Sequence, residues 1–216
     1  MVDQLPLFDE LPADDSWPFG DLEPGKYSVI SSDPPWTWSA WSNKGLKKSA
    51  QRHYNCMTLD DIMALPVADL AAPDAALFLW ATAPMLPQAL AVMDAWNFTY
   101  KSQGVWVKTT VHGKIAFGTG YRLRNSHEIL LLGVRGSPKN TKAERSVIMA
   151  PVRQHSQKPD EFFAMAERWL PGARRAELFS RQSRPGWETW GLEAGKFDNQ
   201  GAQDVVRSGK DSPESL

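Results

Sequence analysis

The sequence has few or none of the features that mark several large classes of protein. A single cysteine, Cys56, excludes an internal disulfide framework and a multi-cysteine metal site. No apolar run approaches the length of a membrane span. Residues 1–25 hold seven acids and no lysine or arginine, unlike the basic start of a signal peptide. We therefore expect a cytoplasmic protein with no membrane partner.

Two further absences concern chemistry. A zinc-dependent base deaminase needs a His-x-Glu and a Cys-x-x-Cys motif, and neither occurs in the sequence. The Gly-x-Gly at Gly118-Thr119-Gly120 lacks the strand-then-helix setting of a dinucleotide-binding fingerprint. It therefore predicts only a loop, and no metal site is expected.

What the sequence does contain fits one α/β domain. A chain of 216 residues with 42% hydrophobic content can bury a substantial core. Short apolar runs alternate with amphipathic segments, which is typical of a sheet covered by helices. We expect the domain over residues 25–194, with flexible tails at 1–24 and 195–216. The expected strands are 27–32, 75–81, 102–107, 127–134 and 174–180. The expected helices are one capped by Thr58 and Asp61 that ends before Pro66, one over Pro84–Trp96, and one from Pro159 that ends at Pro171-Gly172.

Charge is distributed unevenly along the chain, although the net charge is only −1. Residues 101–185 hold sixteen Lys or Arg against six acids, which favours a nucleic-acid surface in this segment. A solvated face of mixed charge is the alternative. A second basic cluster, Lys44, Lys47, Lys48 and Arg52, follows the tetrapeptide described next and could contact phosphates.

The most informative motif is Asp33-Pro34-Pro35-Trp36, directly after the expected strand 27–32. An exocyclic aromatic amine attacks a methyl donor only when its hydrogens are drawn out of the ring plane. The Asp33 carboxylate and the Pro34 carbonyl could accept those two hydrogens, and the locked φ angles of the prolines would hold them in place. Trp36 could stack on a base. The alternative is a strand that ends in a Pro-Pro turn beside a core tryptophan.

The motif is one of several blocks that together resemble the METTL-type N(6)-adenosine methyltransferase family over about residues 26–193. The resemblance implies a Rossmann-like, three-layer α/β/α methyltransferase fold with a mostly parallel sheet. It also implies S-adenosylmethionine as donor and the N(6) amine of adenine in nucleic acid as acceptor. The blocks are Asp33–Trp36, Tyr54–Met57, Leu77–Trp80, Val105–Lys108, Glu128 with Leu132–Gly136, His155–Glu161, Glu177–Arg181, Gly186-Trp187 and Trp190-Gly191.

The resemblance also implies roles for individual residues in the donor pocket. Lys158 would meet the methionine carboxylate, and Glu177 and Arg181 would bracket the ribose hydroxyls. Further donor contacts would come from Asp33, Ser183, Arg184, Leu192 and Glu193, although Leu192-Glu193 replaces the Asn-Gln of the family. An upstream acid that contacts the donor would be Asp14 or Asp15.

On the acceptor side, the resemblance places Tyr54 against the target adenine, where a tyrosine that merely packs before a helix is the alternative. Asn125 and His127 could line the acceptor pocket, but neither is expected to be catalytic. The full substrate-binding prediction is Trp36, Tyr54, Lys44, Lys47, Lys48, Arg52, Lys108 and Asn125.

The polymer and the partners are less constrained by the sequence. We expect DNA, because no RNA-binding module accompanies the domain. RNA is the second choice, and a noncatalytic nucleic-acid-binding paralogue is the alternative from another class. Near the N-terminus, Gln4, Leu5, Leu7 and Phe8 resemble the short peptide with which bacterial proteins dock on the sliding clamp. A tail that folds back through Leu7 and Phe8 is the alternative there. The oligomeric state stays open.

Overall fold

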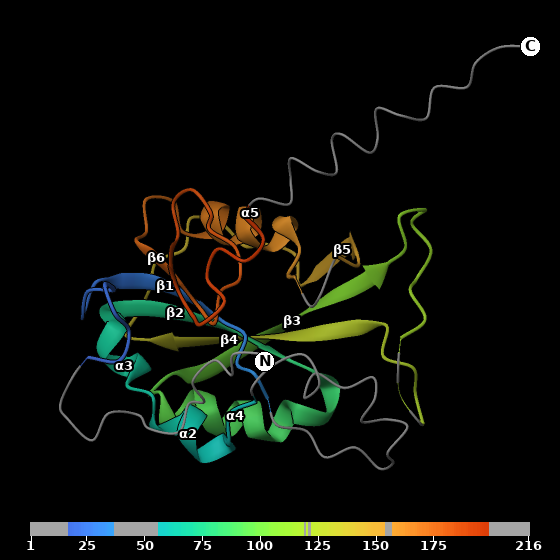
Figure 1. Cartoon of the computed structure of the whole chain (residues 1–216). Helices are drawn as coiled ribbons and strands as arrows, with labels where there is room; N and C mark the ends of the chain where they lie inside the picture. The colour runs from blue at the N-terminus through green and yellow to red at the C-terminus, as the bar shows by residue number, and fades with distance from the viewer. Residues whose placement is uncertain (1–16, 37–55, 119, 121, 154–156, 199–216) are drawn as a thin grey trace, which may run out of the picture.

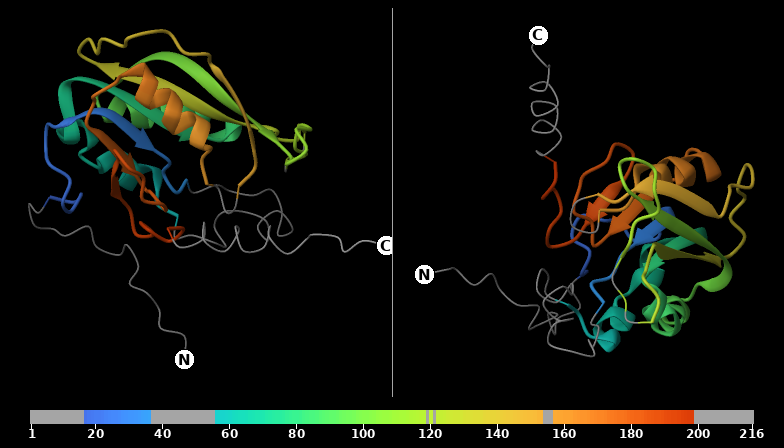
Figure 2. Two further views of the ribbon diagram at one scale, coloured as in Figure 1. Left: turned by 90° about the horizontal axis from the view of Figure 1, so that it is seen from above. Right: turned by 90° about the vertical axis from the view of Figure 1, so that its right-hand side faces the viewer.

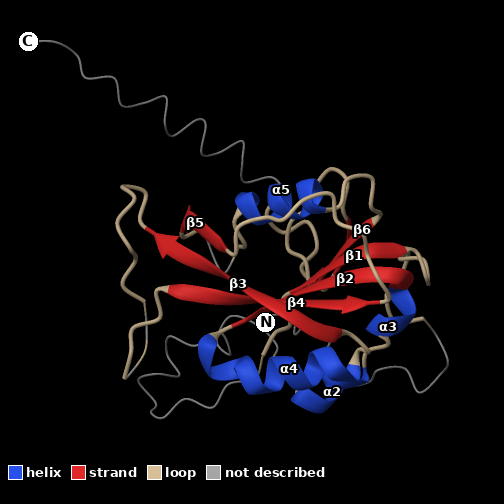
Figure 3. Cartoon of the chain, turned by 180° about the vertical axis from the view of Figure 1, so that it is seen from behind, coloured by secondary structure: helices blue, strands red, loops and turns tan. Residues whose placement is uncertain are grey.

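The computed structural model describes residues 17–36, 56–118, 120, 122–153 and 157–198. A curled, seven-stranded sheet lies between two helical layers (Figures 1 and 3). The strands are β1 (Tyr27–Ser32), β2 (Ala71–Ala81), β3 (Thr99–Thr109), β4 (His127–Arg135), β5 (Val147–Pro151), β6 (Arg175–Leu178) and β7 (Glu188–Trp190). The helices are α2 (Leu59–Ala64), α3 (Val67–Leu70), α4 (Leu86–Ala95) and α5 (Asp160–Trp169), and a 3₁₀ turn, η2 (Ala83–Met85), precedes α4.

The strand order is β5-β3-β4-β2-β1-β6-β7. Four of the six pairings are parallel, and only β4 runs antiparallel to its neighbours β2 and β3. The expected Rossmann-like, mostly parallel fold is thus confirmed. The registers Ser32↔Leu178 and Ala81↔Ile129 bring the carboxyl ends of β1, β2 and β6 to the same edge of the sheet as the start of β4. The site lies at this edge.

Two hydrophobic cores, one on each face of the sheet, hold the three layers together. The first packs α2 and α4 through residues such as Ile62 and Val92 against Leu77 and Leu79 of β2. The second packs α5 against Trp80 and its neighbours, with edge-to-face aromatic contacts at 5.0 to 5.7 Å. Both faces of β2 are buried from Ala75 to Ala81, so this strand is a continuous apolar run rather than an alternating one.

Local sequence signals account for the helix boundaries. The Thr58 hydroxyl accepts the Asp61 N–H at 3.1 Å and so caps α2, as the sequence predicts. Helix α4 ends where Asn97 adopts a φ of 59° and the Phe98 N–H donates to the Met93 carbonyl. Helix α5 buries an apolar stripe of Phe162, Phe163, Met165, Ala166 and Trp169.

Some expected boundaries are wrong. The helix expected over Pro84–Trp96 begins as the 3₁₀ turn η2, with α4 proper starting at Leu86. Pro159 is the N-cap of α5 rather than a residue of its first turn. The strand expected over 174–180 ends at Leu178, because Phe179 has a φ of 59° that leaves the extended conformation. Helix α3 and strands β5 and β7 were not predicted from the sequence. Among the described residues, no helix is long and apolar enough to cross a membrane.

Candidate active site

The tetrapeptide that follows β1 is held in place by backbone and indole hydrogen bonds. The Pro34 carbonyl accepts the Trp36 N–H at 2.8 Å, and the Pro35 carbonyl accepts the Met57 N–H at 3.0 Å. The Trp36 indole donates to the Trp80 carbonyl at 3.2 Å. A carbonyl oxygen has two lone pairs, so that of Pro34 keeps one for another donor. The backbone that carries Asp33 is therefore held rigidly at the edge of the sheet.

Four charged side chains of alternating sign form a chain of ion pairs beside the tetrapeptide. Lys158 Nζ lies 2.7 Å from Asp33 Oδ2 and 2.9 Å from Glu128 Oε2. Lys108 Nζ lies 2.6 Å from Glu128 Oε1. Lys158 also lies 5.3 Å above the Trp80 ring. We call this set, Asp33, Lys158, Glu128 and Lys108, the ion chain.

The pKa values in the ion chain follow from the competition between burial and neighbouring charge. Burial disfavours the charged form of Glu128, but Lys158 and Lys108 lower its pKa to about 2. Burial likewise opposes the charge of Lys158, but Asp33 and Glu128 raise its pKa to about 12. For Asp33, burial outweighs the attraction of Lys158 and raises the pKa above its ordinary value. Of the three, only Asp33 has a pKa shifted in the direction that burial favours.

A pocket with about 340 Å³ of space, part of it open to solvent, adjoins Asp33 and Lys158. Burial raises the pKa of Glu177 in this pocket to about 7, in spite of the nearby Arg184 guanidinium. Glu177 Oε2 is buried without a hydrogen-bond partner among the described residues. An acceptor left in this state favours a ligand that donates a hydrogen bond. The pocket is lined by Asp33, Gln157, Lys158, Glu177, Phe179, Arg181, Gln182 and Arg184.

The wall of the pocket at Phe179 is supported from behind. Beyond the end of β6, the Ser180 N–H donates to the Trp190 carbonyl at 2.9 Å. A Cβ on Gly191 would meet Ser180 N at 2.9 Å, so only glycine permits this approach. The Phe179 ring packs on Trp190 at 5.2 Å, and Trp190 packs on Phe19 at 5.0 Å. The strained φ of Phe179 is thus maintained by its surroundings.

The structure brings five of the eight residues predicted for the donor site into one pocket, namely Asp33, Lys158, Glu177, Arg181 and Arg184. The other three do not line it. The Ser183 N–H donates to Asp198 at 2.7 Å, Leu192 is 71% exposed, and Glu193 pairs with Arg181 at 3.1 Å.

Of the eight residues predicted for the acceptor side, Trp36, Lys108 and Asn125 lie within the described ranges. Trp36 is buried in the core, and Lys108 belongs to the ion chain. Asn125 lies in the connection between β3 and β4, where its carbonyl approaches Gly118. The other predicted residues lie outside the described ranges: Tyr54, Lys44, Lys47, Lys48, Arg52, Asp14, Asp15, and Gln4, Leu5, Leu7 and Phe8 of the clamp-like peptide.

Sequence reasoning gave no role to Glu128, Gln157, Phe179 or Gln182. Glu128 was recognisable only as one residue of a family-like block. Its position between two lysines depends on the antiparallel pairing of β3 and β4, which puts Trp106 opposite Glu128. Phe179 was likewise only one residue of a family-like block, and its part in the pocket follows from an unusual backbone angle.

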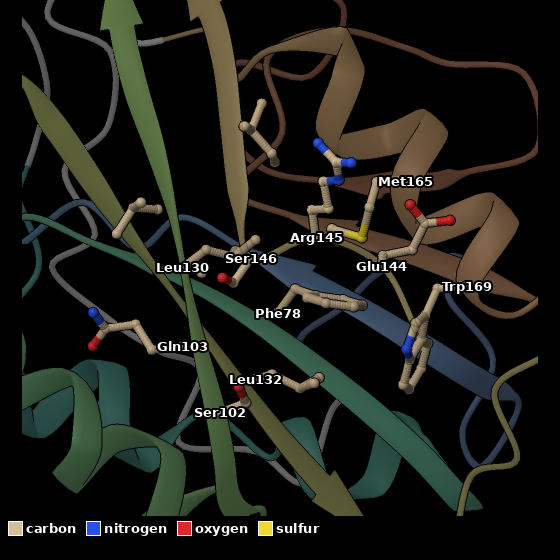
Figure 4. A pocket seen from close by; sticks show the side chains of 13 residues that line it. Phe78, Ser102, Gln103, Leu130, Leu132, Glu144, Arg145, Ser146, Met165 and Trp169 are labelled. Atoms are coloured by element: carbon tan, nitrogen blue, oxygen red, sulfur yellow. The ribbon is translucent and has the colours of Figure 1, made fainter. Parts of the chain in front are cut away.

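A larger cavity, with about 510 Å³ of space, lies elsewhere, between α5 and the α5-facing surface of β2, β3 and β4 (Figure 4). Apolar side chains such as Phe78, Leu130 and Trp169 dominate its wall. The one carboxylate among its described lining residues, Glu144, is paired with Arg168 and Lys142. The cavity therefore offers less for catalysis than the pocket at Asp33.

Comparison with known proteins agrees with this geometry. A family model described as MT-A70 matches residues 27–193. The chain belongs to the MT-A70 family. This is a family of S-adenosylmethionine-dependent methyltransferases, and the matched residues run from β1 to just beyond β7.

Individual MT-A70 relatives come from eukaryotes and from a bacterium. The chain is 34% identical to the human N(6)-adenosine-methyltransferase catalytic subunit METTL3, over 77% of this chain and 28% of the relative. It is 33% identical to an Arabidopsis thaliana N(6)-adenosine-methyltransferase MT-A70-like protein, over 82% of this chain and 25% of the relative. It is 28% identical to the Mycoplasma type II methyltransferase M.MunI, over 81% of both. The chain thus spans only about a quarter of these eukaryotic relatives.

Proposed function

We propose that this protein transfers a methyl group from S-adenosylmethionine to the exocyclic N(6) amine of adenine in nucleic acid, with DNA as the preferred polymer. The observation that supports the proposal best is the ion chain. It holds the Asp33 carboxylate beside a pocket in which the buried Glu177 Oε2 lacks a hydrogen-bond partner among the described residues.

The residues of the pocket fit the proposed donor. Glu177 Oε2 needs a hydrogen-bond donor, and a ribose hydroxyl is one. A lysine has three N–H donors, and two of those on Lys158 face Asp33 and Glu128, which leaves one for the methionine carboxylate. Arg181 and Arg184 add positive charge to the pocket wall. When bound, S-adenosylmethionine would supply an electrophilic methyl group on a positively charged sulfur.

Asp33 and Pro34 would prepare the acceptor amine. The Asp33 carboxylate and the remaining lone pair of the Pro34 carbonyl would accept the two amine hydrogens, which localises the nitrogen lone pair toward the methyl group. The methyl–sulfur bond of the donor would break as the N–C bond forms, which leaves a neutral thioether. The nitrogen would then lose one proton, and Asp33, whose pKa burial raises, suits the role of receiving it. Because Trp36 is buried against the core, we assign it the positioning of the tetrapeptide rather than base stacking. Base stacking then falls to Tyr54.

The preference for DNA is supported by M.MunI, because this relative is a DNA methyltransferase and this chain matches it over most of both lengths. RNA is the second choice, because the eukaryotic relatives are named as adenosine methyltransferases. A target adenine in duplex DNA would have to leave the base stack, at a cost of a few kcal/mol.

The test is to incubate the purified protein with labelled S-adenosylmethionine and matched single-stranded DNA, duplex DNA and RNA, then digest each product and identify the modified nucleoside. We expect N(6)-methyladenine, most of it in DNA. Transfer to RNA alone would move the assignment to the second choice. Binding of nucleic acid without any transfer would support a noncatalytic paralogue and overturn the proposal.

A further inference from the structure

The connection between β3 and β4 forms an arm that runs away from the sheet and back (Figures 1 and 2). It spans residues 109–127, of which 119 and 121 lie outside the described residues. Its first half is a hairpin in which Thr109 forms an antiparallel bridge with Ile115, and the Ala116 N–H donates to the Lys108 carbonyl at 2.8 Å. We call this segment the β3–β4 arm.

The arm has a backbone arrangement that depends on its two central glycines. A Cβ on Gly118 would lie 1.8 Å from the Asn125 carbonyl oxygen, and one on Gly120 would lie 2.0 Å from that of Leu123. No other residue permits such close approaches. The Gly-x-Gly that predicted only a loop therefore lets the outgoing and returning parts of the arm touch.

Large apolar side chains of the arm face solvent. Phe117 and Leu123 are each 82% exposed, Val111 is 81% exposed, and Ile115 is 64% exposed. Exposed apolar side chains gathered in one protruding segment mark an interaction surface. Exposure alone would suit a protein or a nucleic acid.

Charge decides between these two partners. The arm contains Lys114, Arg122 and Arg124 and has no aspartate or glutamate among its residues. The Arg124 guanidinium lies 5.1 Å from the centre of the Phe117 ring. An aromatic ring beside cations is the combination with which proteins hold unpaired nucleotides, the ring against a base and the cations against phosphates.

The arm also starts and ends at the ion chain. Lys108 immediately precedes it and Glu128 immediately follows it, and the two are joined by their 2.6 Å ion pair. Glu128 is linked through Lys158 to Asp33. A polymer bound on the arm would therefore run past the same edge of the sheet as the catalytic tetrapeptide.

We propose that the β3–β4 arm binds the nucleotides next to the target adenine, with Phe117 against a base and Arg124 against the backbone. This proposal rests on the proposed function, since it requires a nucleic-acid substrate. The contacts are independent of sequence, because a ring stacks on any base and a cation pairs with any phosphate. An apolar side chain that wedges into a base step would also help an adenine to leave the stack.

The test compares two double variants of the protein, one in the arm and one outside it. Phe117→Ala with Arg124→Ala changes the arm. Tyr100→Ala with Lys26→Ala is the matched control, because it removes an exposed aromatic residue and an exposed cation that lie outside both the arm and residues 101–185. The measurements are the Kd for a labelled adenine-containing oligonucleotide, the Kd for S-adenosylmethionine, and the molar mass in solution by light scattering.

We expect the arm variant to lose about tenfold or more in oligonucleotide affinity. Its S-adenosylmethionine affinity and its molar mass should stay those of the wild type, and the control should change none of the three. Equal oligonucleotide affinity in the two variants would overturn the arm proposal while wild-type methylation still supported the function. A wild-type oligomer that the arm variant alone loses would instead identify a protein interface. If the wild type methylates no nucleic acid, the proposed function fails first.

Discussion

Asp33 and Glu128 share one ammonium group, and this sharing shapes what a substitution at Asp33 should do. Lys158 contacts both carboxylates, so the loss of Asp33 leaves it paired with Glu128 rather than buried as an isolated charge. An uncompensated buried charge would cost several kcal/mol, and the remaining pair avoids most of that cost. Stability and turnover can therefore be separated at this residue.

The first prediction is that Asp33→Ala keeps the fold but lowers kcat on the order of 10²–10³-fold, because one of the two acceptors for the amine hydrogens is lost. Thermal unfolding checks the fold, and methyl transfer under saturating donor checks kcat. Asp94→Ala, an exposed aspartate on α4, is the control and should match the wild type. Near-normal transfer by Asp33→Ala would show that the tetrapeptide is not the catalytic centre.

Glu177 should make stability depend on pH. Its pKa rises from 4.5 to about 7 in the folded protein, so between these values the folded state keeps a proton that the unfolded state releases. Its contribution to stability is therefore complete below about pH 4.5 and is lost as the pH rises to about 7. Glu177→Gln removes this titration. The unfolding temperature of the variant minus that of the wild type should accordingly increase from pH 5 to pH 8. A pH-independent difference would contradict a Glu177 carboxyl whose pKa is raised by burial.

At the scale of elements, the close approach of Gly191 to Phe179 and Ser180, beyond the end of β6, should affect both the stability of the fold and the shape of the pocket proposed for the donor. In Gly191→Ala the new Cβ would collide with the backbone of Phe179 and Ser180. We expect a lower unfolding temperature and weaker S-adenosylmethionine binding, because Phe179 lines the pocket. Calorimetry measures both quantities.

Gly172→Ala is the control for this prediction. Gly172 has a φ of 73° with open space around it, so the variant should lose about 1 kcal/mol of stability through strain alone. Since Gly172 lies before β6, at the opposite end of this strand from Phe179, and does not line the pocket, donor affinity should not change. If both variants bound the donor equally, the close approach of Gly191 to Phe179 and Ser180 would have no part in shaping the pocket.

The elements that the sequence predicted are those with long apolar runs or clear caps. The strands over β1, β2, β3 and β4 and the helix α5 carry such signals, and the structure has them. Strand β5 has only five residues, one of them Pro151, and β7 has three, so neither offers enough pattern to recognise. The direction of β4 was also unpredictable, since a buried apolar run has the same composition whether its neighbours are parallel or antiparallel.

Part of the candidate site could be predicted from the sequence, because the resemblance gave roles to particular residues. Asp33, Lys158, Glu177, Arg181 and Arg184, to which the resemblance gave donor contacts, line one pocket, and their contact with the donor stays a prediction. The ion chain was not predictable, because Lys108 and Glu128 lie twenty positions apart and meet only through strand register. Trp36 shows the opposite case, because its expected stacking face is packed into the core.

For the molecule as a whole, the basic cluster after the tetrapeptide should control long-range attraction to the polymer. Replacing Lys44, Lys47 and Lys48 with alanine should reduce the slope of log Kd against log salt by about 0.9 for each phosphate that the variant no longer neutralises. Lys26, Lys196 and Lys210, which lie outside this cluster and outside residues 101–185, give a control with the same change in net charge. Titrations at several salt concentrations measure the slope. Identical slopes would remove the cluster from the binding surface.

The central position of β1 has a consequence for how the chain is made. Strand β1 leaves the ribosome before the other strands, yet one of its two neighbours, β6, lies near the far end of the domain. Until β6 is synthesised, one side of β1 is an open edge that can pair with other chains. Pairings so distant in sequence also slow folding. The pocket proposed for the donor is lined by both Asp33 and Glu177 and is therefore among the last parts to form, so the ability to bind the donor would distinguish finished molecules from nascent ones.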